Sequence, residues 1–299
     1  MAIGPQQRAK WLIKQLELEA PLQIADIGAR ISNEKPVYRR ILQLEAGKLH
    51  AFEPEPKAFK ELEESKPDYA TLYNVAVGKP GKATFFAHHI GSLSSIFKFA
   101  PACAEYLNKG FWVKRPITEM EVELVALDEV EGFPKLDILK MDVQGAELDI
   151  MQGGMKTLAE TVMVIPEVRF YRMYQDEPMW ADLDGEMRKQ GFVLHKFLHQ
   201  KTVTLRSRRW KKFAKGAGSQ LLDGDAVYIR NLEAPEKVST HQLKALALAA
   251  DVLCQSYDLC AFCLEQLVQR EVLEPKVIAA YVNRLPAEVL APEDDKVNA

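Results

Sequence analysis

Short apolar runs alternate with stretches of helical periodicity from about residue 20 to residue 200. The runs that predict β-strands span residues 22–27, 48–53, 71–77, 136–141, 162–168, 192–197 and 226–229. Helical patterns lie between most of them, at 34–45, after Pro56, from Gly145 to Leu158 and at 180–190. This alternation is typical of a parallel sheet with helices on both faces. No helical pattern separates the last two strands, so this pair is predicted to be antiparallel.

Residues 80–127 interrupt the alternation. Two further strand patterns, at 82–87 and 119–127, flank a hydroxyl-rich loop at 91–95. The segment is therefore predicted to be a β-rich insertion above the main sheet.

Helical patterns occupy both ends of the chain. The first 18 residues favour an amphipathic helix, and residues 241–285 favour two or three short helices joined at Ser256 and Pro275. We expect one domain at 1–235 and a helical appendage at 236–299. About 45 helical residues form a weak core alone. The appendage is therefore expected to dock on the main domain or on another subunit, which makes a homodimer a hypothesis.

Composition excludes several classes of protein. The formal net charge of −3 gives no general attraction to nucleic acid. No apolar run reaches the roughly 18 residues that a membrane-spanning helix needs. Arg8, Lys10 and Lys14 interrupt the N-terminal apolar positions, so a signal peptide is not expected. The sequence predicts a cytoplasmic protein.

The four cysteines do not form a metal motif. Cys260 and Cys263 are one helical turn apart in an apolar stretch, and no second pair of ligands accompanies them. Buried thiols are expected here, and no metal site is predicted.

One segment concentrates positive charge. Residues 201–219 hold no acidic residue but seven basic ones, Lys201, Arg206, Arg208, Arg209, Lys211, Lys212 and Lys215. The segment is either a solvated loop or a lid that attracts an anionic substrate or a phosphate-bearing carrier. Trp210 within it either stacks on a sugar or anchors the loop.

The polar residues at the strand ends are the main candidates for chemistry, because ligands of open parallel sheets bind at the carboxyl ends of strands. These candidates are Asp26 and Gly28, Glu53, Asn74 and Ala76, Lys140 and Asp142, and Glu167. Glu53 follows Gly28 at a spacing close to that of the acidic residue that binds a ribose diol. The further glycines of a pyrophosphate-binding loop are absent after Gly28.

Several segments together resemble the FkbM family of methyltransferases. They occur in family order at 26–29, 51–56, 74–78, 127–130, 137–147 and 224–228, and the part from Lys140 to Glu147 is the most distinctive. The resemblance implies a class I methyltransferase fold, Rossmann-like, with a last antiparallel strand. It also implies S-adenosylmethionine as donor and O-methylation in sugar, polyketide or glycan pathways. The residues expected to bind the donor are Asp26, Gly28, Ala29, Arg30, Glu53, Pro54, Asn74 and Ala76.

The chain departs from the family pattern at two places. The family pattern has an Asn and a further Gly after Ala29, where this chain has Arg30 and then Ile31 and Ser32, and Arg30 is a candidate contact for the donor's carboxylate. Gln144 stands where the family usually has Glu.

Asp142, Glu167 and Lys140 are the catalytic candidates. Either carboxylate can take the acceptor's proton or anchor the acceptor, and Lys140 can lower the pKa of a hydroxyl or pair with a carboxylate. Glu147 fits the N-terminus of the following helix, and the His88–His89 pair fits a surface position. Two carboxylates alone are too few to indicate a metal.

Two alternatives stay open. A nicotinamide-dependent oxidoreductase can use a similar sheet, although the missing glycines disfavour it. The altered loop after Gly28 also admits a non-catalytic binding protein that kept the fold.

Overall fold

The computed structural model describes residues 3–31, 35–214 and 216–291. The expected helix start at Glu34 and the basic residue Lys215 lie outside this part. The chain divides into two compact units. One comprises residues 1–22, 34–48 and 232–299, and the other comprises 23–33 and 49–231.

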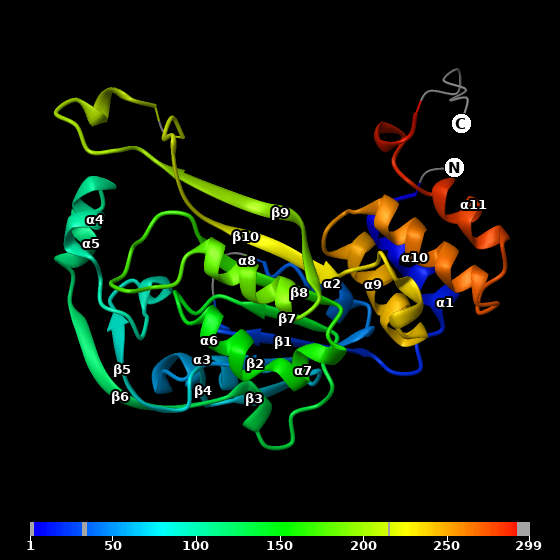
Figure 1. Ribbon diagram of the computed structural model, residues 1–299, viewed down its shortest axis with the longest axis horizontal. Coiled ribbons are helices and arrows are strands. Elements are labelled where there is room, and N and C mark those ends of the chain that lie inside the picture. Colours follow the sequence, from blue (N-terminus) through cyan, green and yellow to red (C-terminus); the bar gives the residue numbers. More distant parts are fainter. Residues whose placement is uncertain (1–2, 32–34, 215, 292–299) are drawn as a thin grey trace. The chain divides into compact units, whose positions relative to one another are not determined.

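A seven-stranded sheet forms the centre of the larger unit, in the order β3-β2-β1-β7-β8-β10-β9 (Figure 1). Its strands are β1 (Leu22–Ile27), β2 (Gly47–Phe52), β3 (Ala70–Tyr73), β7 (Ile138–Met141), β8 (Met163–Arg169), β9 (Phe192–Val203) and β10 (Gln220–Arg230). β7 pairs in parallel with β1 and β8, whereas β10 is antiparallel to β8 and β9. The expected class I fold, mostly parallel with an antiparallel last strand, is confirmed.

Two strand predictions need correction. The single strand expected at 71–77 is divided, because the chain turns away at Asn74 and Val75 and its second half, β4 (Ala76–Val77), joins a different sheet. β9 and β10 are also longer than their apolar runs. Their outer halves include polar, exposed residues such as Lys201, which apolar periodicity does not mark.

Helices α6 (Glu147–Gly153), α7 (Met155–Glu160) and α8 (Trp180–Lys189) pack on the large sheet, and α3 (Pro56–Glu64) follows β2. The helix expected as far as Leu158 is interrupted at Gly154. A Cβ there would meet the Ile150 carbonyl oxygen at 2.9 Å. The core between helices and sheet includes Phe52, Met141 and Ile150.

Residues 76–125 form a small second sheet in the order β4-β6-β5. β5 (Gly81–His88) and β6 (Ile117–Val125) are antiparallel, and α4 (Pro101–Tyr106) and α5 (Gly110–Val113) lie between them in the chain. Buried apolar side chains join this region to residues after β8, among them Phe99, Trp112 and Tyr174.

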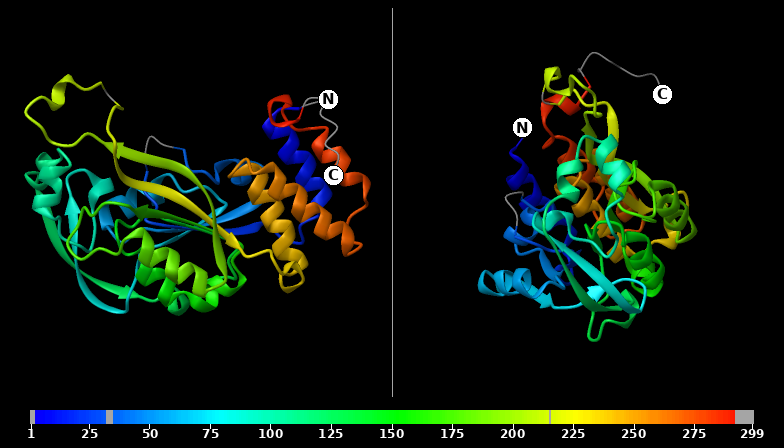
Figure 2. Two further views of the ribbon diagram at one scale, coloured as in Figure 1. Left: turned by 45° about the horizontal axis from the view of Figure 1, so that its top comes forward. Right: turned by 90° about the vertical axis from the view of Figure 1, so that its left-hand side faces the viewer.

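The smaller unit contains α1 (Pro5–Leu16), α2 (Arg39–Gln43), α9 (Thr240–Val252), α10 (Tyr257–Gln269) and α11 (Lys276–Val282) (Figure 2). α1 packs against α9 and α11, so the N-terminal helix shares a core with the C-terminal ones. Arg8 of α1 is buried and donates a hydrogen bond to Asp251 of α9 at 2.7 Å. Cys260 and Cys263 are buried thiols, and burial raises the pKa of both.

No helix in the described part of the chain combines the length and apolarity needed to cross a membrane.

Candidate active site

The carboxyl ends of four adjacent strands bring the predicted residues together. Gly28, Glu53 and Asp142 follow β1, β2 and β7 directly, and Glu167 lies near the end of β8. The register pairs Ile27 with Met141, and β7 and β8 continue side by side. Across the sheet the order is therefore Glu53, Gly28, Asp142 and Glu167.

Gly28 allows β1 and β7 to end close together. Its φ is +88°, and a Cβ at this position would lie 2.2 Å from the Asp142 carbonyl oxygen. The amides of Gly28 and Ala29 donate to the Phe52 carbonyl oxygen at 3.1 and 2.9 Å. The turn after β1 is thus tied to the end of β2, one residue before Glu53.

Glu53 is a buried carboxylate whose oxygens are only partly satisfied. Oε1 accepts a hydrogen bond from the Glu55 amide at 2.8 Å, whereas Oε2 lies 3.8 Å from Arg30 Nε, beyond hydrogen-bonding distance. Burial raises the pKa of Glu53 to about 7, although the Arg30 charge opposes this rise. Two hydroxyl donors of a ribose would complete the carboxylate's hydrogen bonding.

Arg30 faces this acidic site. Its guanidinium forms an ion pair with Glu55 and donates to the Gly91 carbonyl oxygen at 2.7 Å. Glu53 therefore has a cation near its carboxylate, with Arg30 Nε 3.8 Å from Oε2. Arg30 links the donor loop to the insertion at Gly91. Its contacts are the Glu55 carboxylate and the Gly91 carbonyl oxygen.

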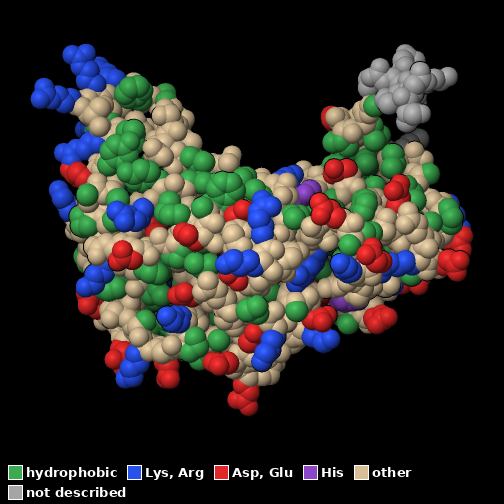
Figure 3. Space-filling model, viewed as in Figure 1, with side chains coloured by type: hydrophobic (Ala, Val, Ile, Leu, Met, Phe, Trp, Pro, Cys, Tyr) green, Lys and Arg blue, Asp and Glu red, His purple; other side chains and the backbone are tan. Residues whose placement is uncertain are grey.

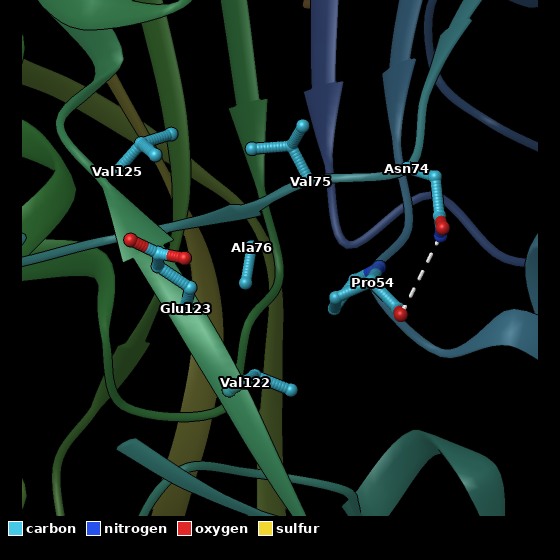
Figure 4. Close-up of a pocket in the computed structure, with 7 residues that line it drawn as sticks. All are labelled: Pro54, Asn74, Val75, Ala76, Val122, Glu123 and Val125. Carbon is cyan, nitrogen blue, oxygen red and sulfur yellow. Dashed lines mark hydrogen bonds between the residues drawn. The ribbon is translucent and has the colours of Figure 1, made fainter. Parts of the chain in front are cut away.

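A cavity of about 340 Å³ opens next to Pro54, the residue that follows Glu53 in the chain (Figure 4). Pro54, Asn74 and Ala76, three of the predicted donor contacts, line it together with Val75, Val122, Glu123 and Val125. Asn74 Nδ2 donates to the Glu53 carbonyl oxygen at 2.8 Å, which fixes this side of the cavity to the end of β2. A carboxylate suited to a diol next to a cavity with valine and alanine walls fits an adenosyl group.

Gln144 connects the two candidate carboxylates. Its Nε2 donates to Asp142 Oδ1 at 2.7 Å and to Glu167 Oε2 at 2.6 Å. Its Oε1 accepts from Arg169 Nη2 at 3.0 Å and lies 3.2 Å from the Tyr174 hydroxyl. The positive φ of 59° at Gln144 turns the chain so that the amide lies between both groups. A side-chain amide suits this place because it donates and accepts at once.

Arg169 is the centre of a charged cluster that the sequence analysis missed. It is buried and pairs with Glu167 at 2.7 Å, Asp223 at 3.0 Å and Glu177 at 3.4 Å. Burial raises the pKa of Glu167, and the Arg169 charge opposes that rise. A signal was present, because Arg169 follows Glu167 by two residues and therefore points to the same face of the strand.

Lys140 is an ion-pair partner in this structure. Its Nζ lies 3.0 Å from Asp225 Oδ1. Burial lowers the pKa of Lys140, but Asp142, Asp225 and Asp26 together raise it above its ordinary value. Lys140 is thus a cation paired with a carboxylate, which is one of the two roles expected for it.

Three nearby residues stabilise loops. Glu147 is buried and accepts hydrogen bonds from the amides of Val143 and Gly145 at 3.0 and 2.9 Å, as its place at a helix start suggested. Ser95 donates to the Gln144 carbonyl oxygen at 2.6 Å. The surface position expected for both histidines is wrong for His88, which is buried with Nε2 3.0 Å from the Trp112 carbonyl oxygen.

A second cavity, of about 220 Å³, shares Tyr174 with the Gln144 network. It is lined by Phe86, Leu93, Phe97, Lys98, Phe99, Val113, Ile117, Glu119, Tyr174 and Gln175. Its aromatic walls and few polar groups are typical of sites for small molecules. Among the residues that the structure describes, no group of three His, Cys, Asp or Glu could hold a metal ion.

Comparisons with known proteins point to one family. The model of the methyltransferase FkbM domain matches residues 26–194. A 2-O-methyltransferase, NoeI, from Sinorhizobium fredii (strain NBRC 101917 / NGR234) is 30% identical over 186 residues, which cover 58% of this chain and 74% of that protein.

Solved structures of methyltransferases also match. Magnesium protoporphyrin IX methyltransferase (ChlM) from Synechocystis PCC 6803 is 14% identical, with a TM-score of 0.33 over 76% of this chain and 78% of that chain. A putative S-adenosylmethionine-dependent methyltransferase from Listeria monocytogenes is 7% identical, with a TM-score of 0.39 over 75% of this chain and 100% of that chain.

The family match begins at Asp26, at the end of β1, and extends through Asp142 and Glu167 to β9. It therefore includes all four strand ends of the site and spans more than half of the 299 residues. The chain belongs to the FkbM family of methyltransferases.

Proposed function

We propose that this chain is an O-methyltransferase that methylates a hydroxyl of a sugar, a glycan or a polyketide-like small molecule. S-adenosylmethionine supplies an electrophilic methyl group when it is bound. The observation that carries the proposal is the pair Asp142 and Glu167, which Gln144 holds beside the donor turn at Gly28. The relative named as a 2-O-methyltransferase supports a hydroxyl acceptor.

We assign different tasks to the two carboxylates. Glu167 accepts short hydrogen bonds from both Gln144 and Arg169, so it is a positioning residue. Asp142 is exposed, and its amide donates to the Ile27 carbonyl oxygen at 3.0 Å, next to the donor turn, so its side chain can contact the acceptor. Asp142 therefore binds the acceptor hydroxyl and takes its proton, while Gln144 fixes the carboxylate's orientation.

The cavity that shares Tyr174 with Gln144 is the proposed acceptor site. Aromatic rings such as Phe86 and Phe97 can pack against the C–H face of a sugar or against an apolar ring. An anionic acceptor, a homodimer through the C-terminal helices and a cytoplasmic location stay predictions.

The test is transfer of an isotope-labelled methyl group from S-adenosylmethionine to a panel of monosaccharide glycosides, oligosaccharides and hydroxylated macrolides. We expect an alkali-stable methyl ether on one class of acceptor, and a loss of kcat of at least about 100-fold in Asp142→Asn. Glu167→Gln should lower kcat less.

Three outcomes would contradict the proposal. Binding of NAD in place of the donor would favour the oxidoreductase alternative. Failure to bind any adenosyl cofactor would favour the non-catalytic alternative. A product methylated on nitrogen or carbon would place the chain outside O-methylation.

A further inference from the structure

The β9–β10 hairpin extends beyond the large sheet into an arm of exposed residues (Figure 1). We call residues 206–214 the arm. All nine of its residues are exposed, including Trp210 at 39% and Phe213 at 59%. Lys211 Nζ lies 5.8 Å from the centroid of the Trp210 ring, and apolar side chains that gather in one exposed patch mark interaction sites.

The arm carries a concentrated positive charge. Figure 3 shows basic side chains gathered over its outer end, next to hydrophobic ones. Arg206 pairs with Glu105, but among the described residues Arg208, Arg209, Lys211 and Lys212 make no ion pair. Because the whole chain has a net charge of −3, the positive charge is locally segregated.

A neighbouring element extends the same surface. The Arg206 amide donates to the Tyr106 carbonyl oxygen at 3.0 Å, which fixes the base of the arm against α4. Tyr106 is 44% exposed and Phe111 of α5 is 50% exposed. Burial and the charge of Lys201 lower the pKa of Lys109 in the same region. The basic arm and the exposed aromatic residue Tyr106 of α4 are thus neighbours, and Phe111 of α5 is a further exposed aromatic side chain on the segment that follows α4.

We propose that this surface docks on an anionic phospholipid bilayer. Arginine and lysine side chains that make no ion pair attract anionic headgroups, and Trp and Phe favour the boundary between headgroups and acyl chains. A soluble polyanion such as heparin is bound mainly through its charges, whereas a bilayer interface also accommodates the exposed rings of Trp210 and Phe213. The aromatic residues at the outer end therefore favour a bilayer, and docking would bring the active site to acceptors carried at a membrane surface.

The test is co-sedimentation of the full chain with vesicles of phosphatidylcholine alone or mixed with phosphatidylglycerol. We expect partitioning that rises with the anionic fraction and falls with salt. The quadruple variant R208Q/R209Q/K211Q/K212Q should lower the partition coefficient at least about tenfold. The matched control K60Q/K66Q/K135Q/K156Q removes the same charge from exposed positions elsewhere and should bind as the wild type does.

A second measurement separates a bilayer from a polyanion. Quenching of tryptophan fluorescence by acyl-chain-brominated lipids should occur in the wild type and disappear in Trp210→Phe, whereas W210S/F213S should lose vesicle binding. Retained binding of S-adenosylhomocysteine would show that these variants fold.

Equal binding to both vesicle types would overturn the proposal, and so would unchanged binding by the arm variants. Binding to heparin that does not depend on Trp210 and Phe213, with no vesicle binding, would assign the surface to a polyanion instead.

Discussion

At the residue scale, Glu53 shows how burial and an incomplete set of hydrogen bonds predict a ligand. The residue is 4% exposed, and its Oε2 lies 3.8 Å from Arg30 Nε, beyond hydrogen-bonding distance. Burying a polar group without full hydrogen bonding costs free energy. A ribose whose two hydroxyls donate hydrogen bonds to the Glu53 carboxylate therefore stabilises it.

This site predicts a pH-dependent affinity. Because burial holds the pKa of Glu53 at about 7, the proton must leave before the carboxylate can accept both ribose hydroxyls. The affinity for S-adenosylhomocysteine should therefore rise as the pH increases from about 6 to about 8. Calorimetric titration at several pH values checks this. Glu53→Gln should bind weakly without a step near pH 7, and an affinity that falls as the pH rises would refute the assignment.

Gln144 predicts a pH-dependent stability. Gln144→Glu would place a third carboxylate within reach of Asp142 and Glu167 and remove the shared donor. Like charges raise carboxyl pKa values in the folded state, so the destabilisation should grow as the pH rises. We expect a loss of about 1–3 kcal/mol of unfolding free energy at pH 8 and a smaller loss at pH 5, measured by urea denaturation.

The control is Gln144→Met, which removes the amide without adding a charge. Its loss of stability should change little between the two pH values. Equal stability of Gln144→Glu and wild type at pH 8 would mean that the three groups do not interact.

At the scale of elements, the turn after β1 depends on the close approach of two strands. Gly28→Ala would combine a strained φ of +88° with a contact of 2.2 Å to the Asp142 carbonyl oxygen. We expect the unfolding free energy to fall by more than about 3 kcal/mol, and we expect no measurable donor binding.

Gly132→Ala separates strain from steric overlap. Gly132 has a φ of +67°, and nothing lies within 4 Å of the position that a Cβ would take, so only the strain of about 1 kcal/mol should appear. Equal losses in both variants, measured by denaturant unfolding, would show that the overlap with Asp142 contributes nothing.

The sequence predicted the central sheet because its strands are apolar and end at recognisable polar residues. β1 was predicted with its observed bounds, and the carboxylates at the strand ends followed from the same runs. Interactions between distant residues were not predicted. Arg169 meets Asp223 and Glu177 only after folding, and Gln144 was noted only as a departure from the family pattern.

At the scale of the whole molecule, local sequence patterns did not predict which distant helices pack together. The sequence predicted α1 and the C-terminal helices separately, but nothing in either pattern showed that Arg8 and Asp251 would meet. The expected boundary at residue 235 between a methyltransferase domain and a helical appendage stays a prediction. Packing alone places residues 1–22 in the same compact unit as residues 232–299.

The buried pair predicts strong coupling within this unit. Arg8→Met leaves the buried Asp251 carboxylate with the Tyr281 hydroxyl, 2.9 Å away, but without its cation. We expect a loss of about 3–5 kcal/mol in unfolding free energy. Lys82→Met breaks the exposed Lys82–Glu121 pair and should cost less than about 1 kcal/mol. Similar small losses in both variants would show that Asp251 does not depend on Arg8.

The central claim is that the ends of β1 and β2 bind the adenosyl donor. Calorimetric titration with S-adenosylhomocysteine tests it most directly, with Glu53→Ala as the variant and Glu63→Ala, exposed on α3, as the matched control. We predict micromolar binding by the wild type and by Glu63→Ala, and its loss in Glu53→Ala. Binding that survives in Glu53→Ala, or its absence in the wild type, would contradict the account.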